Sequence, residues 1–264
     1  MTTPTTFFGW VGLLLDQYGS LFLRGTGITL LVSITGTVIG FVIGLLVAIV
    51  RTIPASPKDP LWKRILLKLC GILMTVYIEV FRGTPMIVQA MVIYYGASQY
   101  MGLRMQPLFA AIFIISINTG AYMAEIVRGG IISVDKGQKE AAHAIGMTHW
   151  QSMVHVVLPQ AVRNIMPSIG NEFVVNIKDS SVLNVISVSE LFFTAKSASG
   201  TYLRYFEAFF ICACIYLVLT FTVTRLLRLL ERKMDGKNTY TILGSQSSAD
   251  SAITIREEAD GNAD

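Results

Sequence analysis

Charged and amide side chains interrupt the apolar segment 165–188, and their spacing places them on one helix face. Glu172, Asn176, Asp179 and Ser180 fall at positions i, i+4, i+7 and i+8, which makes one polar stripe on an otherwise apolar helix. Ionisable groups at membrane depth are costly and face a bundle interior or water. The stripe therefore predicts part of a polar pathway. The alternative is an amphipathic surface helix, which the flanking loops disfavour because a crossing is needed to alternate their charge.

Two other apolar segments carry polar groups of the same kind. Asn118, Tyr122 and Glu125 lie at i, i+4 and i+7, and therefore share a face of the segment 108–127. The segment 66–95 contains EVFRGTP, in which Pro85 should break or kink the helix. The predicted pathway residues are Glu79, Arg82, Gly83, Thr84, Pro85, Asn118, Tyr122, Glu125, Asn171, Glu172, Asn176, Asp179 and Ser180.

A structural role for these charges is the rival interpretation. The acidic groups can instead pair with Arg82, Arg128 or Lys178 and hold the helices together. Spacing along the sequence does not separate a pathway from such ion pairs, because the partners come from different segments.

Several kinds of chemistry are not indicated. The chain has no G-x-x-x-x-G-K-[ST] motif, so we expect it neither to bind nor to hydrolyse ATP. His143, His149 and His155 are six positions apart; six residues turn a helix by about 240°, so no metal site is expected. No Ser-His-Asp or Cys-His arrangement has a supporting motif. Cys70, Cys212 and Cys214 lie in or beside apolar runs and are interpreted as small packing residues.

Composition sets the class of protein that must position these groups. Of 264 residues, 53% are hydrophobic and only 14% are charged, against about 25% charged in soluble domains. The chain is predicted to be an all-α polytopic membrane protein. Its net charge of +4 does not imply a nucleic-acid partner, because basic cytoplasmic loops raise the charge of membrane proteins.

Five transmembrane helices are predicted, over residues 28–50, 66–95, 108–127, 165–188 and 206–230. Gly36, Gly40 and Gly44 in the first form a strip that allows close helix packing. Residues 1–27 are expected to be an external or interfacial segment, with a Gly-rich turn before the first span and no cleaved signal peptide. Residues 28–233 form the transmembrane domain, 97–107 and 194–205 are outer loops, and 234–264 are a polar, disordered cytoplasmic tail.

The basic residues predict the orientation. They concentrate in 51–64, 128–163 and 225–237, whereas the other side carries only Arg24, Arg104, Lys196 and Arg204. Positive loops stay in the cytoplasm. The N-terminus is therefore expected outside, and the C-terminus and the 128–163 loop inside.

That loop contains QKEAAHAIGMTHWQSMVHVVLP at 138–159. Residues 138–145 favour a helix, Gly146 suits the position after its end, and Thr148 with Gln151 has capping-box spacing for a second helix. The run Glu140-Ala141-Ala142, then Gly146, then Leu158-Pro159 resembles the EAA loop of the membrane subunits of ABC importers, with Val156 where isoleucine is common. EVFRGTPMIVQ, AYMAEIVRGG and GNEFVVNIKDSS are similar to segments of the polar amino acid branch, with Ser180 near a usual Thr.

The resemblance covers roughly residues 20–235 and implies the type I ABC importer transmembrane fold. Residues 130–163 would form a cytoplasmic helix-turn-helix that docks on the ATPase, with Glu140, Ala141, Ala142, Gly146, Leu158 and Pro159 as coupling residues. It also implies a bacterial inner-membrane location and a second permease subunit, identical or homologous. An extracytoplasmic solute-binding protein would deliver the solute. This chain would hold no cofactor, because ATP and Mg²⁺ bind the ATPase subunit.

A polar amino acid needs partners for both its ammonium and its carboxylate once its water is removed. Glu125, Glu172 and Asp179 could face the ammonium, and backbone N–H groups freed near Gly83–Pro85 the carboxylate. An ion-coupled secondary transporter that uses Glu79, Glu125 and Glu172 as proton sites is the alternative. A membrane scaffold without transport is a third. The sequence identifies neither the amino acid nor the partner permease.

Overall fold

The computed structural model describes residues 4–53 and 60–234. The regular elements there are all helical: α1 (Phe7–Thr52), α2 (Leu61–Gly83), α3 (Met86–Met101), α4 (Pro107–Ser133), α5 (Lys136–Ala144), α6 (His149–Ser152), the π-helical η1 (Met153–Val157), α7 (Leu158–Asp179), the 3-10 helix η2 (Ser180–Ile186), α8 (Leu191–Tyr202) and α9 (Tyr205–Met234). The all-α prediction is confirmed for these residues. The predicted tail from 235 onward, and residues 54–59 of the basic loop, lie outside the described ranges.

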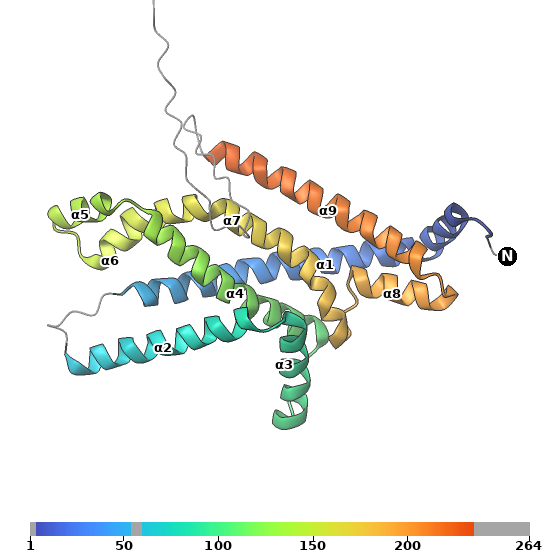
Figure 1. Cartoon of the computed structure of the whole chain (residues 1–264), viewed down its shortest axis with the longest axis horizontal. Coiled ribbons are helices and arrows are strands. Elements are labelled where there is room, and N and C mark those ends of the chain that lie inside the picture. Colours follow the sequence, from blue (N-terminus) through green and yellow to red (C-terminus); the bar gives the residue numbers. More distant parts are fainter. Residues whose placement is uncertain (1–3, 54–59, 235–264) are drawn as a thin grey trace, which may run out of the picture.

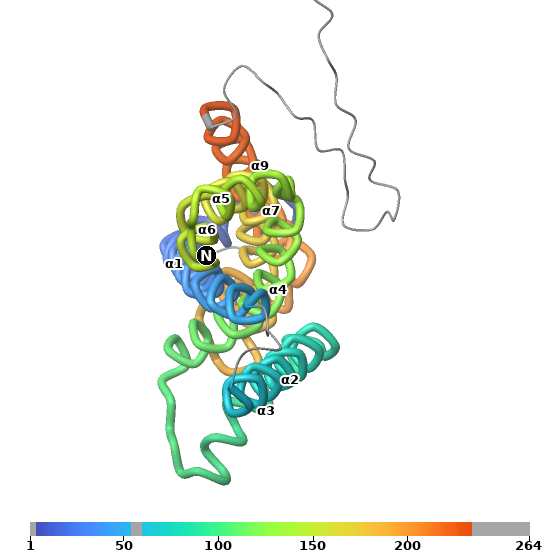
Figure 2. The backbone as a smooth tube through the Cα atoms, turned by 90° about the vertical axis from the view of Figure 1, so that its left-hand side faces the viewer, coloured from blue at the N-terminus to red at the C-terminus, as the bar shows by residue number. Residues whose placement is uncertain are grey.

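The molecule is elongated, with α5 and α6 at one end and the start of α1 with α8 at the other (Figure 1). The long helices α1, α4, α7 and α9 run along this axis, and α3 projects from it. Viewed end-on, α2 and α3 lie to one side of the other helices (Figure 2). The longitudinal helices therefore form the body of the fold, and the α2–α3 pair flanks it.

The glycine strip of α1 makes the tight contact that its spacing predicts. A Cβ built on Gly36 or Gly44 would overlap Ile115 or Met123 of α4, and one on Gly40 would come 2.8 Å from Thr119. Backbones can approach this closely only where side chains are absent. The strip therefore joins α1 to α4, the helix with the most continuous buried face.

The Gly-rich turn predicted before the first span is wrong. α1 runs without interruption from Phe7, so residues 7–27 are helical and continuous with the first predicted span. Gly25 is instead a packing position, because a Cβ there would come 2.8 Å from Thr194 Oγ1 and 3.0 Å from the Glu190 carbonyl oxygen. The N-terminal part of α1 is held against α8 and α9 by a cluster that includes Leu14, Phe22 and Leu191.

The second predicted span is two helices. α2 ends at Gly83, Thr84 has extended backbone angles, and α3 begins after Pro85. Proline lacks an N–H and disfavours helical geometry in the residue before it, so the predicted break at Pro85 is confirmed. The single segment 66–95 is corrected to the pair α2 and α3.

Two more boundaries differ from expectation. The segment 165–188 is α-helical only to Asp179, and η2 continues to Ile186. The predicted outer loop 194–205 is mostly α8, whose N-cap Glu190 accepts hydrogen bonds from the N–H groups of Phe192 and Phe193. This carboxylate cap begins a helix that hydropathy alone does not mark.

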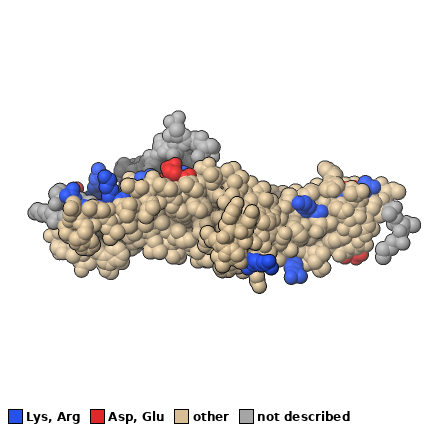
Figure 3. Space-filling view, turned by 90° about the horizontal axis from the view of Figure 1, so that it is seen from below, with Lys and Arg blue, Asp and Glu red and all other residues tan. Residues whose placement is uncertain are grey.

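The surface is consistent with a lipid environment. Most of the face in Figure 3 is free of Lys, Arg, Asp and Glu. Within the described residues, three helices are long and apolar enough to cross a membrane: Phe7–Thr52, Pro107–Ser133 and Tyr205–Lys233. These three support a multi-pass membrane protein, and the finer five-span arrangement is taken up below as a proposal.

Candidate functional site

A polar pocket of about 300 Å³ lies where the α2–α3 break meets α4 and α7. Its lining joins residues from all three places that the sequence marks as polar. The lining residues are Thr84, Pro85, Met86, Asn118, Thr119, Tyr122, Glu172, Val175, Asn176 and Asp179. The fold thus brings seven of the predicted pathway residues to one site.

Two carboxylates face this pocket from α7. Glu172 is only 5% exposed and Asp179 is partly buried. Within the part of the chain that the structure describes, neither makes a hydrogen bond or an ion pair. Buried charges are normally paired, so this arrangement is suited to a ligand that brings its own positive charge.

The start of α3 supplies groups of the opposite polarity. Pro85 and Met86 line the pocket, and the first helical N–H groups that bond within the chain are those of Val88 and Gln89, both to the Pro85 carbonyl. The N–H groups at a helix start carry a partial positive charge and attract anions. The pocket therefore combines carboxylates on one wall with a helix N-terminus on another.

A glutamine that sequence reasoning did not single out fixes the broken helix. Gln89 Nε2 donates to the Phe81 and Thr84 carbonyl oxygens, both at 2.9 Å, and Asn118 Nδ2 donates to Gln89 Oε1 at 2.9 Å. Gln89 replaces backbone bonds that the break at Pro85 removes. Its position four residues after Pro85 is the only signal that could have indicated this role.

The remaining predicted pathway residues lie elsewhere. Glu79 and Asn171 are exposed outside the pocket, and Gly83 ends α2 without lining it. Ser180 is buried at the start of η2, where its hydroxyl donates to the Ile177 carbonyl. Arg82 lies over the Tyr122 ring, 5.6 Å from its centroid, which places a cation beside the pocket.

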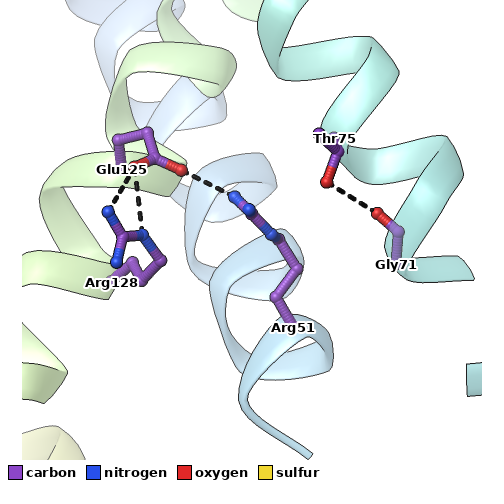
Figure 4. A network of polar contacts seen from close by, with 5 residues as sticks. All are labelled: Arg51, Gly71, Thr75, Glu125 and Arg128. Atoms are coloured by element: carbon purple, nitrogen blue, oxygen red, sulfur yellow. Dashed lines mark hydrogen bonds and ion pairs between the residues drawn. The ribbon is translucent and has the colours of Figure 1, made fainter. Parts of the chain in front are cut away.

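Glu125 belongs to a different cluster. Its carboxylate accepts from Arg51 Nη1 at 2.6 Å and from Arg128 Nη2 at 2.7 Å (Figure 4). Arg51 comes from the end of α1 and was not predicted as a partner, because 74 positions separate it from Glu125. The structure thus places Glu125 in ion pairs that join α1 to α4, away from the lining of the pocket.

The loop 130–163 forms a helical hairpin at one end of the molecule. Asp135 accepts from the Gly137 N–H and caps α5. Gly146 has φ +83°, and the Met147 N–H bonds back to the Ala142 carbonyl, as in a glycine-terminated helix. The predicted capping box is present: Thr148 and Gln151 bond reciprocally at the start of α6.

The predicted coupling residues surround this turn. Glu140, Ala141, Gly146 and Pro159 are exposed, Leu158 is partly buried, and Ala142 packs inward. Sequence reasoning missed two exposed apolar side chains beside Gly146, namely Ile145 at 79% and Trp150 at 60% exposed. Burial lowers the pKa of His149, assisted by the positive charges of Lys139 and His143. The exposed Ile145 and Trp150 make part of the hairpin tip apolar.

Comparison with known proteins shows to which protein family the chain belongs. A family model described as the binding-protein-dependent transport system inner membrane component matches residues 67–236. The glutamine transport system permease protein GlnP of Escherichia coli is 38% identical over 215 residues, which cover 81% of this chain and 93% of that protein. The chain belongs to the family of binding-protein-dependent transport system inner membrane components.

A second relative and a solved structure support the same family assignment. The arginine transport system permease protein ArtQ of Bacillus subtilis is 34% identical over 216 residues, covering 82% of this chain and 93% of that protein. The crystal structure of an amino acid ABC transporter with histidines superposes with a TM-score of 0.73 at 39% identity, covering 84% of this chain and 97% of that one. The chain thus shares both sequence and fold with amino acid ABC transporters.

Proposed function

We propose that the pocket between α3, α4 and α7 holds a polar amino acid during its passage through an ATP-driven importer. The chain is the permease subunit of an amino acid ABC importer, as its family and its relatives show. It is not an enzyme, since ATP hydrolysis belongs to a separate subunit in this family. The site residues and the arrangement of the subunits are the parts proposed here.

The observation that carries the site proposal is the pair of unpartnered carboxylates. The α-ammonium of an amino acid would neutralise Glu172 or Asp179, and its α-carboxylate would lie at the start of α3. The other carboxylate and the Asn118 amide would then face the side chain of the solute. Relatives named for glutamine and arginine transport fit this class, because both solutes carry donor-rich side chains.

We further propose five membrane crossings, made by α1, the α2–α3 pair, α4, α7 and α9. α2 and α7 carry polar and charged residues, yet they run along the same axis as the apolar helices (Figure 1). The basic loops support an orientation with the hairpin and the C-terminus in the cytoplasm and the N-terminus outside. Glu79, Gly83 and Asn171 would then reach the solute path only together with a second permease subunit.

The hairpin is the proposed contact with the ATPase. The family implies an ATPase and a solute-binding protein as partners. The exposed turn at Gly146, with Ile145 and Trp150 beside it, offers an apolar knob for a groove on the ATPase. The ATPase would also contact residues around this turn, namely Glu140, Ala141, Leu158 and Pro159. The buried Ala142 would hold α5 in place. ATP and Mg²⁺ would bind the ATPase and not this chain.

Uptake into proteoliposomes tests the proposal. We expect labelled amino acid to enter only when the chain is combined with its ATPase, its binding protein and internal ATP. Gly146→Asp should abolish uptake, because an Asp side chain at φ +83° strains the turn and blocks docking. Gly12→Asp, on an exposed face of α1 with open space around it, is the matched control. Uptake by the chain alone, driven by a proton or sodium gradient, would instead support the secondary-transporter alternative.

A further inference from the structure

A second cavity lies far along α2 from the amino acid pocket. It has a volume of about 390 Å³ and is formed by the end of α1 and the first half of α2. The lining residues are Val50, Arg51, Ile53, Leu67, Lys68, Gly71, Ile72, Thr75 and Val76. We call it the α1–α2 groove. Two cations and a mostly apolar wall distinguish it from the acidic pocket.

The two cations of the groove are available to an anion. Among the described residues, Lys68 makes no ion pair or hydrogen bond, and it is exposed. Arg51 uses Nη1 for Glu125 (Figure 4), and a guanidinium has five N–H donors in all. Glu125 is shared with Arg128, so the one carboxylate in this cluster does not neutralise both arginines. The groove is therefore electropositive.

The rest of the groove follows successive turns of α2. A Cβ at Gly71 would meet nothing within 4 Å, so the middle of the groove is open. The Thr75 hydroxyl is turned back to the Gly71 carbonyl at 2.9 Å (Figure 4). Ile72 and Val76 are 51% and 54% exposed and continue the groove as apolar surface.

The position of the groove along α2 matches the edge of a bilayer. Trp62, in the first turn of α2, is 68% exposed, and tryptophan is enriched at membrane–water interfaces. Lys68 lies about 9 Å further along the helix axis, a depth from which a lysine side chain reaches back to the interface. In a bilayer entered at Trp62, Ile72 and Val76 would lie deeper still, at the level of acyl chains.

We propose that the α1–α2 groove binds an anionic phospholipid, with its phosphate between Arg51 and Lys68 and an acyl chain over Ile72 and Val76. Charge complementarity carries this choice of occupant. A zwitterionic lipid brings an ammonium that offsets its phosphate, so it gains less from two cations. The proposal goes beyond amino acid import and does not depend on which solute the pocket carries.

Native mass spectrometry of the full chain in detergent, titrated with phosphatidylglycerol or phosphatidylcholine, tests this site. We expect tighter binding of phosphatidylglycerol, and a loss of about fivefold in its affinity for Lys68→Gln, the usual contribution of one basic residue at an anionic surface. Lys68→Arg should restore binding. Lys233→Gln, an exposed lysine at the end of α9, is the matched control and should change nothing.

A second variant tests the shape of the groove without altering its charge. Gly71→Leu fills open space on α2 and raises helix propensity, so the chain should fold and still lose the lipid. Equal losses in the Lys68 and Lys233 variants would overturn the proposal in favour of diffuse surface attraction. Displacement of the lipid by millimolar inorganic phosphate would assign the site to a soluble anion. A disulfide between Ile72→Cys residues of two copies in the assembled transporter would assign the groove to a second subunit.

Discussion

Asn176 Nδ2 donates a hydrogen bond to the Thr37 hydroxyl at 2.8 Å, across 139 positions of the sequence. Oδ1 of the same amide accepts a hydrogen bond from Thr119 Oγ1 at 3.1 Å. Asn176 therefore joins α7 to both α1 and α4 while it lines the amino acid pocket. One side chain connects the packing of three helices to the shape of the site.

Asn176→Ala should destabilise the fold, because Thr119 loses its acceptor and a polar contact between membrane helices is worth about 0.6–1.7 kcal/mol. Asn176→Asp keeps an acceptor for Thr119 but adds a buried carboxyl group beside Glu172 and Asp179, so it should lose no less stability. Thermal unfolding in detergent measures both. Asn171→Ala, exposed on the same helix, should leave the melting temperature unchanged. Equal stability of all three variants would show that the amide does not hold the helices together.

Glu172→Gln and Asp179→Asn should weaken binding of the amino acid in transit while the chain still assembles. A hydrogen bond to a charged group contributes about 1.5–3 kcal/mol, so we expect a roughly tenfold or larger rise in the concentration for half-maximal uptake. Asp16→Asn, exposed near the start of α1, is the matched control. Loss of assembly in place of loss of uptake would assign the two carboxylates a structural role.

Gly44→Ala should prevent normal packing of α1 on α4. The new Cβ would overlap Met123 and come 2.7 Å from the Ala124 backbone nitrogen, and a backbone atom in a packed helix cannot move aside cheaply. Overpacking of this kind costs about 1–3 kcal/mol. Gly27→Ala, in the same helix with open space around it, should be neutral or stabilising by about 0.5–1 kcal/mol. We therefore expect Gly44→Ala to lower both the yield and the melting temperature in detergent, and Gly27→Ala to leave both unchanged or raise them.

Trp150→Ala should weaken assembly with the ATPase. Truncation of a tryptophan at the centre of an interface commonly costs about 2 kcal/mol or more, which corresponds to a loss of about thirtyfold in affinity. Trp62→Ala is the control, since Trp62 is comparably exposed but belongs to α2 and not to the hairpin. Co-purification of the ATPase and stimulation of its activity report the effect. Similar losses for both tryptophans would place the contact elsewhere.

Features that depend on neighbours in the sequence were predictable. The capping box of Thr148 and Gln151, the left-handed Gly146 and the break at Pro85 follow from local backbone chemistry, and all three are present. The close packing of the glycine strip was predictable, because glycines four residues apart lie on one face of a helix. The polar stripes and the segment EVFRGTP also contain most of the residues that line the pocket.

Features that depend on distant partners were not predictable in the same way. Gly25 looked like part of a turn, because nothing nearby in the sequence indicates that α8 packs against it. Glu125 was predicted as a pathway residue, with pairing to Arg128 as the alternative; the Arg128 pair is present. The second partner, Arg51, was not predictable, because it lies on another helix. The 12 residues of α8 have no clear amphipathic pattern that would distinguish them from a loop, and the helix begins at the buried N-cap Glu190.

The unbroken course of α1 limits how the length of this chain can change during evolution. Gly25 touches α8 and Gly36 touches α4, and these two contacts are 11 residues apart on one helix. Eleven residues complete almost exactly three helical turns, so both glycines share a face. Inserting or deleting one residue between them would rotate one contact by about 100° relative to the other. We expect this interval to tolerate many substitutions and almost no insertions or deletions.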